Sequence, residues 1–288
     1  MTNRIPVLRA VQMYLEFCRA RNDSPNTIRA YNSNLLSFVS CIGHETAITE
    51  ITRKRIRQYL FSLDASLKRT TVRQKIASLK SFCNWLVGES LLDTSPCEGI
   101  AGPRPHQELP DVPSEADMAK LIDGEIPSAY PERDRVILEL LYSCGLRAAE
   151  VAGVNVDDFT SNTLLVRGKG KKERLVPVGR KALLAVTEWL PLRKKYLTEM
   201  ELETPALLFS LGPRESVERL DVRTIRRVVR AVAIANKLPP YHPHQLRHAC
   251  GTHCHDHGMP IQVVAQMLGH ARLSTAQIYT RVSSVRML

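Results

Sequence analysis

The sequence predicts a mainly α-helical protein of two domains, a four-helix domain followed by a larger, mainly helical domain with a small antiparallel β-sheet. Three observations predict this fold class. Apolar residues recur at helical spacing through most of the chain. A stretch rich in Gly and Pro divides the chain near residues 100–113. The clearest β-prone runs are two short segments on either side of a glycine-bearing turn.

Residues 1–100 are expected to form the all-helical domain. Four segments have helical apolar spacing, each follows a turn or polar breaker, and no strand signal lies among them. The segment that begins at Ser24 and Pro25 is typical of entry into a helix. The four predicted helices are Val7–Ala20, Asn26–Ile42, Thr52–Leu63 and Thr70–Gly88.

Residues 101–113 show no periodicity and contain several prolines, which predicts an extended linker. The second domain, residues 114–288, opens at Ser114, which is typical of a helix N-cap with acidic residues in the first turn. A helix over Arg133–Cys144 is closed by Gly145, and another begins at Leu146–Glu150.

The hairpin lies in this second domain. Thr163–Arg167 and Arg174–Val178 are β-prone runs joined by the turn Gly168–Lys172, and helical patterns follow them. The second domain is therefore predicted to be mainly helical with one small sheet.

The charge of the chain indicates a polyanionic partner. Lys and Arg number 40 against 29 Asp and Glu, a net charge of +11, and nucleic acid is the leading candidate. In isolation, basic runs on helices are solvated surfaces; beside a candidate phosphate site they predict contacts to double-stranded DNA. The basic residues gather at the starts of the third and fourth helices: Arg53, Lys54, Arg55, Arg57, Lys68, Arg69, Arg73, Lys75 and Lys80.

The sequence also indicates a compartment. It has no apolar run of the roughly 18–20 residues that a membrane span requires, and Met1–Ala20 lacks a signal-peptide core. Seven cysteines in scattered, mostly apolar contexts fit reduced thiols. We expect a cytoplasmic, nucleoid-associated protein with no membrane partner.

A candidate phosphate site begins with His244 and Arg247. A spacing of three places both on one helical face, near an N-terminus begun by Pro243, where exposed N–H groups favour an anion. The structural alternative is an arginine paired with a surface carboxylate beside a partly buried histidine.

Four further residues extend this candidate site. His270 follows a glycine that closes the predicted helix Pro260–Leu268, and Tyr279 lies about one turn into the next helix. Arg147 follows the Gly145 cap, and Lys169 lies in the hairpin turn. Singly, each has an ordinary structural explanation: a helix-end cation, an exposed lysine, a core tyrosine. Together they could surround one phosphate.

The joint order of Gly-Leu-Arg-x-x-Glu, Gly-Lys-Gly, His-x-x-Arg-His, Leu-Gly-His and a late Tyr resembles the tyrosine site-specific recombinases of the phage integrase family, in particular Xer-like or transposon-borne members. Ser24–Tyr31 and Leu79–Leu86 are similar to phrases of the family's N-terminal half. The resemblance implies a SAM-like core-binding domain over 1–100 and a catalytic domain over 114–288.

The resemblance also implies roles for the six residues. Tyr279 is the nucleophile, and Arg147 and Arg247 bind the scissile phosphate. His270 adds a hydrogen bond to that phosphate, Lys169 protonates the leaving 5′ oxygen, and His244 assists proton removal from the tyrosine. Glu150, three residues beyond Arg147, is expected to orient a basic side chain rather than to act in catalysis.

These roles agree with physical chemistry. Two guanidinium groups and an imidazole donor neutralise the charge that develops on a phosphodiester under attack, without a metal. A phenol with a pKa near 10 needs a base or a cationic surrounding to attack, and a departing alkoxide needs a proton donor. The phosphotyrosine bond conserves the energy of the phosphodiester, so we expect no cofactor, metal or ATP.

Two alternatives stay open: a type IB topoisomerase, and a sequence-specific DNA-binding protein whose phosphate site is catalytically idle. The resemblance implies a dimer on each site and a tetramer in synapsis, or a second related recombinase as partner. The resemblance also implies that a C-terminal helix is exchanged between neighbouring protomers, but the nine residues after Tyr279 support this exchange poorly. Dimer resolution, cointegrate resolution and integration remain possible roles.

A metal site competes for the segment 248–257. Its residues at i, i+4 spacing could bind zinc; the lack of a second ligand set at matching spacing favours no metal. The residues concerned are His248, Cys250, His253, Cys254, His255 and His257.

Overall fold

The computed structural model describes residues 4–63, 65–103, 111–168, 173–211 and 216–269. The chain forms two compact units, residues 1–107 and 108–288, and each is described by itself. None of the helices within these ranges combines the length and apolarity that a membrane span needs.

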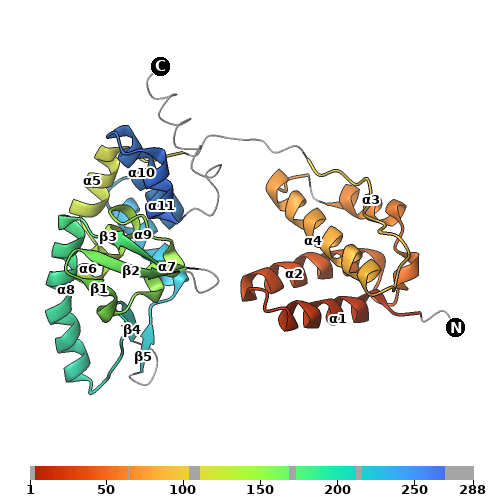
Figure 1. The fold of residues 1–288 in the computed structure, drawn as a ribbon, viewed down its shortest axis with the longest axis horizontal. Coiled ribbons are helices and arrows are strands. Elements are labelled where there is room, and N and C mark those ends of the chain that lie inside the picture. The colour runs from red at the N-terminus through yellow and green to blue at the C-terminus, as the bar shows by residue number, and fades with distance from the viewer. Residues whose placement is uncertain (1–3, 64, 104–110, 169–172, 212–215, 270–288) are drawn as a thin grey trace. The chain divides into compact units, whose positions relative to one another are not determined.

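The described residues of the first unit form four α-helices and one 3₁₀ turn (Figure 1). Helix α2 packs against α1, α3 and α4. The predicted four-helix arrangement is confirmed, because local capping and periodicity define each helix: Ser24 Oγ accepts a hydrogen bond from the Thr27 N–H, and Thr52 caps α3 in the same way. The elements are α1 (Val7–Ala20), α2 (Pro25–Ile42), η1 (Ile48–Glu50), α3 (Arg53–Ser62) and α4 (Arg69–Gly88).

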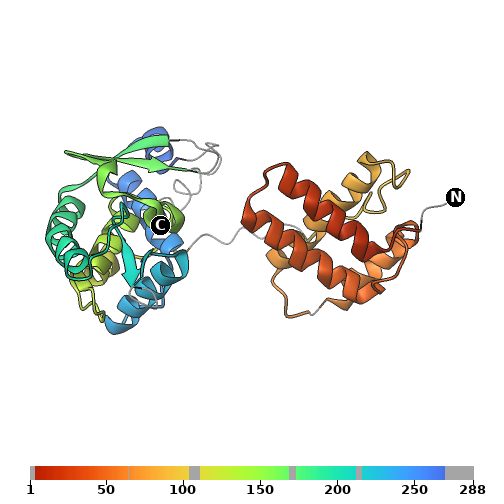
Figure 2. The ribbon, with the colours of Figure 1, turned by 90° about the horizontal axis from the view of Figure 1, so that it is seen from below.

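Among the described helices of the second unit, α6 is central and contacts five others. Figures 1 and 2 show the remaining helices gathered around it, with a three-stranded sheet on one side. Ser114 and Asp117 form the predicted capping box at the start of α5. The helices are α5 (Glu115–Asp123), α6 (Pro131–Tyr142), α7 (Ala148–Gly153), α8 (Arg180–Glu199), α9 (Val222–Ala235), α10 (Pro243–Asp256) and α11 (Ile261–Leu268).

The two predicted hairpin strands form β2 and β3 of the larger sheet, with Leu165 opposite Leu175, and the unpredicted β1 extends it in the antiparallel order β1-β2-β3. A second, two-stranded sheet of β4 and β5 was not predicted, because alternation cannot be recognised in three-residue strands. The strands are β1 (Phe159–Thr160), after the 3₁₀ turn η2 (Val156–Asp158), β2 (Thr163–Arg167), β3 (Glu173–Pro177), β4 (Phe209–Leu211) and β5 (Val217–Arg219).

Two glycines bring the site elements together. Gly145, between α6 and α7, has φ +62°, and a Cβ there would clash with Leu268 Cδ2 and lie 3.0 Å from Cys250 Sγ. The turn before α7 therefore packs directly on α10 and α11. Gly269 ends α11 in the left-handed conformation at φ 65°, as the sequence predicted for this C-cap.

Candidate active site

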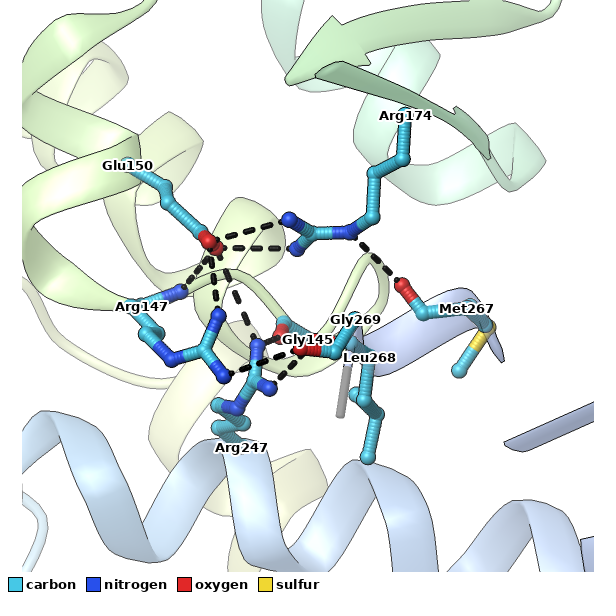
Figure 3. A network of polar contacts seen from close by, with 8 residues as sticks. All are labelled: Gly145, Arg147, Glu150, Arg174, Arg247, Met267, Leu268 and Gly269. Atoms are coloured by element: carbon cyan, nitrogen blue, oxygen red, sulfur yellow. Dashed lines mark hydrogen bonds and ion pairs between the residues drawn. The ribbon is translucent and has the colours of Figure 1, made fainter. Parts of the chain in front are cut away.

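The carboxylate of Glu150, on the first turn of α7, is surrounded by three arginines (Figure 3). Arg147 donates to it from Nη1 at 2.8 Å and from its backbone N–H at 2.9 Å. Arg174, on β3, donates from Nη1 and Nη2 to the two oxygens, each at 2.9 Å. Arg247, on α10, has Nη1 3.7 Å from Oε2. Three positive charges thus share one negative charge.

The same three arginines also bind three consecutive carbonyl oxygens at the end of α11 (Figure 3). Arg174 Nε donates to Met267 O at 3.0 Å, and Arg147 Nη2 donates to Gly269 O at 3.2 Å. Between them, Arg247 Nη2 donates to Leu268 O. The C-terminal end of a helix carries partial negative charge, which favours cations there. The cluster is therefore held between a carboxylate and a helix end.

The surroundings of Glu150 keep it ionised. Its side chain is only 5% exposed, and this burial by itself raises the pKa. Hydrogen bonds from Arg174 and the Arg147 backbone, with the charges of both arginines, outweigh burial and lower the pKa of Glu150 to about 2. Glu150 thus acts as a permanent anionic anchor for the arginines.

The two arginines predicted to bind phosphate differ in access. The Arg147 side chain is 43% exposed, and two of its five side-chain N–H groups are used by Glu150 and Gly269. Arg247 is 2% exposed and also donates to Gly145 O at 2.6 Å. An anion in solution can therefore reach Arg147 directly, whereas Arg247 is covered.

His244 lies in the first turn of α10, one turn before Arg247. Its ring contacts that of His248, with centroids 4.4 Å apart. Burial lowers the pKa of His244, and the charges of Arg247, His242 and Arg147 lower it further. The imidazole is therefore neutral at pH 7 and able to accept a proton.

Lys169, His270 and Tyr279 lie outside the described residues. Lys169 belongs to the connection between β2 and β3, and His270 directly follows Gly269 in the chain. The structure thus brings together Arg147, Glu150, Arg247 and the start of α10 with His244.

The basic residues predicted to contact DNA have different environments in the first unit. Lys75 Nζ donates to Ser37 Oγ at 3.0 Å and to Tyr59 Oη at 3.3 Å. Arg55 pairs with Glu50 at 3.2 Å, and Lys80 is half-buried. The six that are exposed are Arg53, Lys54, Arg57, Lys68, Arg69 and Arg73.

Sequence reasoning missed two features. Arg174 follows the hairpin turn, and no local pattern connects it with a carboxylate 24 residues earlier. Helix α9 has an exposed arginine face opposite its buried aliphatic face, and it contains no acidic residue. Helical periodicity could have revealed that face. Its members are Arg223, Arg226, Arg227 and Arg230.

Three histidines of α10 and its C-cap have separate partners. Tyr142 Oη lies 2.9 Å from His253 Nδ1, His255 contacts Met259 O, and His257 pairs with Glu115. Within the described ranges, no three His, Cys, Asp or Glu side chains lie close enough together to hold a metal ion.

Two family models match most of the chain. Residues 114–286 match the model of the phage integrase family, and residues 11–90 match that of the phage integrase N-terminal SAM-like domain. Tyrosine recombinase XerC of Thermodesulfovibrio yellowstonii is 34% identical over 271 residues, which cover 91% of this chain and 87% of the relative.

Solved structures show the same fold. A XerH site-specific recombinase bound to a palindromic difH substrate, in a post-cleavage complex, aligns with a TM-score of 0.75 at 21% identity, covering 94% of this chain and 81% of the other. A lambda integrase tetramer bound to a Holliday junction aligns with a TM-score of 0.74 at 16% identity, covering 96% and 78%. The chain is a member of the phage integrase family, the tyrosine recombinases.

Proposed function

We propose that this protein is a site-specific DNA recombinase that cleaves and rejoins DNA strands through a 3′-phosphotyrosine at Tyr279. The observation that carries this proposal is the cluster of arginines anchored on Glu150, with His244 one turn before Arg247 on α10, in a chain of this family. Relatives named as tyrosine recombinases over nearly the whole chain support it.

The arginine cluster supplies the electrostatic part of the reaction. Three guanidinium charges against one carboxylate leave an excess of positive charge, and Arg147 presents it to solvent. A phosphodiester bound there gains stabilisation as charge builds on its nonbridging oxygens. Contact between this phosphate and Arg247 requires the groups that cover this side chain to move aside, because Arg247 is only 2% exposed.

The remaining roles concern protons. The Tyr279 phenol oxygen attacks phosphorus, and neutral His244 assists removal of its proton. The bond from phosphorus to the 5′ oxygen breaks, and Lys169 delivers a proton to that oxygen. His270 donates a hydrogen bond to the phosphate. Attack by a 5′ hydroxyl on the phosphotyrosine reverses these steps and rejoins the strand. Each bond that breaks is matched by one that forms, and the named side chains supply and accept every proton.

The partner in this proposal is double-stranded DNA. Residues 1–100 serve as the core-binding domain and residues 114–288 as the catalytic domain, joined by 101–113. The exposed arginines of α3, α4 and α9 supply cations for the phosphate backbone. Similar solved structures include a lambda integrase dimer bound to a core site and a lambda integrase tetramer bound to a Holliday junction, which supports a homo-oligomer with a dimer on each site. The place of action is the cytoplasm, at the nucleoid.

Covalent trapping tests the proposal. Fragments of host genomic DNA that the protein binds supply candidate sites. A suicide substrate made from them carries a nick close to the cleavage position, so the short fragment with the 5′ hydroxyl diffuses away after cleavage. Wild type should become attached to labelled DNA, whereas Tyr279→Phe should bind the same DNA and attach none. Absence of trapping on every bound site would favour an idle DNA-binding protein.

A second assay separates strand exchange from relaxation. A plasmid that carries two target sites changes its connectivity only if strands from different sites are rejoined. Relaxation of supercoils without recombinant products would favour a topoisomerase and contradict the proposal.

A further inference from the structure

We infer that Arg174 is a positioning residue of the cleavage reaction: it fixes the Glu150 carboxylate and the end of α11, and through them the guanidinium groups of Arg147 and Arg247. The inference rests on the proposed function, because it assigns Arg174 to the same site. Arg174 acts through these neighbours and does not contact DNA.

Arg174 is turned inward. Its two terminal nitrogens bind both Glu150 oxygens, and its Nε binds Met267 O, so three of its donors point into the protein. The side chain is 16% exposed, against 43% for Arg147. A Cβ on Gly269 would lie 3.1 Å from the Arg174 side chain, which shows how closely the end of α11 covers it. This side chain is therefore placed to hold protein groups rather than a phosphate.

The two-pronged contact has a specific effect on Glu150. With Arg147 alone, each oxygen of the Glu150 carboxylate would accept one hydrogen bond, both from the same side. The terminal torsion of the Glu150 side chain, which is only weakly restricted by itself, would then be less tightly held. The fork of Arg174 fixes the carboxylate plane. The two oxygens are then aimed at Nη1 and the backbone N–H of Arg147, and one of them lies 3.7 Å from Arg247 Nη1. A lysine cannot reproduce this geometry, because it is a point charge without a fork.

Arg174 also connects elements that are distant in sequence. It is the second residue of β3, the strand that directly follows the hairpin connection with Lys169. Its contacts join this strand to α7 through Glu150 and to α11 through Met267. Loss of Arg174 would thus loosen the carboxylate and release a helix-end carbonyl at the same time.

The experiment separates binding from cleavage. Arg174→Lys, Arg174→Ala and wild type are compared for DNA affinity by fluorescence anisotropy, and for the single-turnover rate of suicide-substrate cleavage at saturating protein. Arg193→Lys is the matched control, because Arg193 on α8 also binds carbonyl oxygens, those of Thr204 and Ala206, away from Glu150. Arg174→Ala and Arg193→Lys are measured again with guanidinium chloride against sodium chloride at equal ionic strength.

We expect both Arg174 variants to keep wild-type DNA affinity and to cleave at least roughly tenfold more slowly, since small misplacements of catalytic groups cost up to ~10²-fold. Guanidinium should restore part of the rate of Arg174→Ala and leave Arg193→Lys unchanged. Should Arg174→Ala unfold, Arg174→Lys, which keeps the positive charge, decides the question.

Two outcomes overturn the inference alone: Arg174→Lys cleaves at the wild-type rate, or its DNA affinity falls in parallel with the rate, which would make Arg174 a DNA contact. Failure of wild type itself to trap DNA would instead refute the proposed function.

Discussion

Replacement of Glu150 by Gln should destabilise the second unit, because Glu150 is the shared anion of three arginines. Glutamine keeps the shape but offers one oxygen and one amide group. N–H groups of Arg147 and Arg174 point at the positions of both Glu150 oxygens. In either orientation of the glutamine amide, its nitrogen would therefore face an N–H donor. The variant therefore loses the charge and at least one hydrogen-bond acceptor.

The magnitude follows from the pKa of Glu150, which the arginines lower from 4.5 to about 2. This shift corresponds to a stabilisation of about 3 kcal/mol at neutral pH. A carboxyl with a lowered folded-state pKa stabilises the protein fully above its unfolded pKa. That contribution is lost as pH falls from about 4.5 through about 2, and about half is gone near pH 3.

Urea unfolding followed by tryptophan fluorescence measures this difference. Trp189 is fully buried in the second unit, and the chain has only one other tryptophan, Trp85 in the first unit. A Trp85→Phe background makes the signal report the second unit alone. The free energies of unfolding with and without Glu150→Gln should differ by about 3 kcal/mol at pH 7 and about half of that near pH 3. A difference below about 1 kcal/mol, the usual worth of an exposed ion pair, or one that is equal at both pH values, would refute the reasoning.

Three other predictions address separate groups. Hydrogen bonding with Cys250 lowers the pKa of Cys254 below that of an ordinary thiol, so iodoacetamide should label Cys254 with a midpoint below pH 9 and spare buried Cys250; equal labelling in peptide mass spectra would contradict this. Burial lowers the pKa of His244, so the acid limb of the single-turnover cleavage rate should lie below pH 6.5 and vanish in His244→Gln. Arg57 is exposed, so Arg57→Ala should weaken DNA binding for all sequences and reduce the slope of log affinity against log salt by about one; an unchanged slope would exclude a phosphate contact.

Local features explain what the sequence could predict. Helix α1 has the predicted bounds Val7–Ala20, because its apolar residues keep helical spacing without interruption and a turn or breaker lies at each end. The hairpin strand β2 also has its predicted bounds, Thr163–Arg167, and β3 is shifted by one residue. Helix α6 begins two residues before the predicted Arg133, at Pro131, which suits a first helical turn.

The rest depends on contacts between distant segments. The sequence indicated that Glu150 orients a basic side chain, but the geometry involves three arginines, one of them from a strand. Every residue has a main-chain oxygen, so the residue types at 267–269 do not mark these oxygens as acceptors. Their hydrogen bonds with the arginines could therefore not be predicted. The burial of Arg247 likewise follows from the packing of α10 against the turn at Gly145.

The arginines bind the main-chain oxygens of Met267, Leu268 and Gly269 at the end of α11. The site therefore depends on the number of residues in α11 more than on which residues they are. Substitution at Met267 leaves its main-chain oxygen in place for Arg174. Insertion or deletion of one residue in Ile261–Leu268 would instead turn the following backbone by about 100° and displace it by about 1.5 Å along the axis. All three acceptors would then lose register with their arginines together. Natural variation in this segment should therefore consist of replacements, and a single-residue indel should inactivate the protein even where every named side chain is retained.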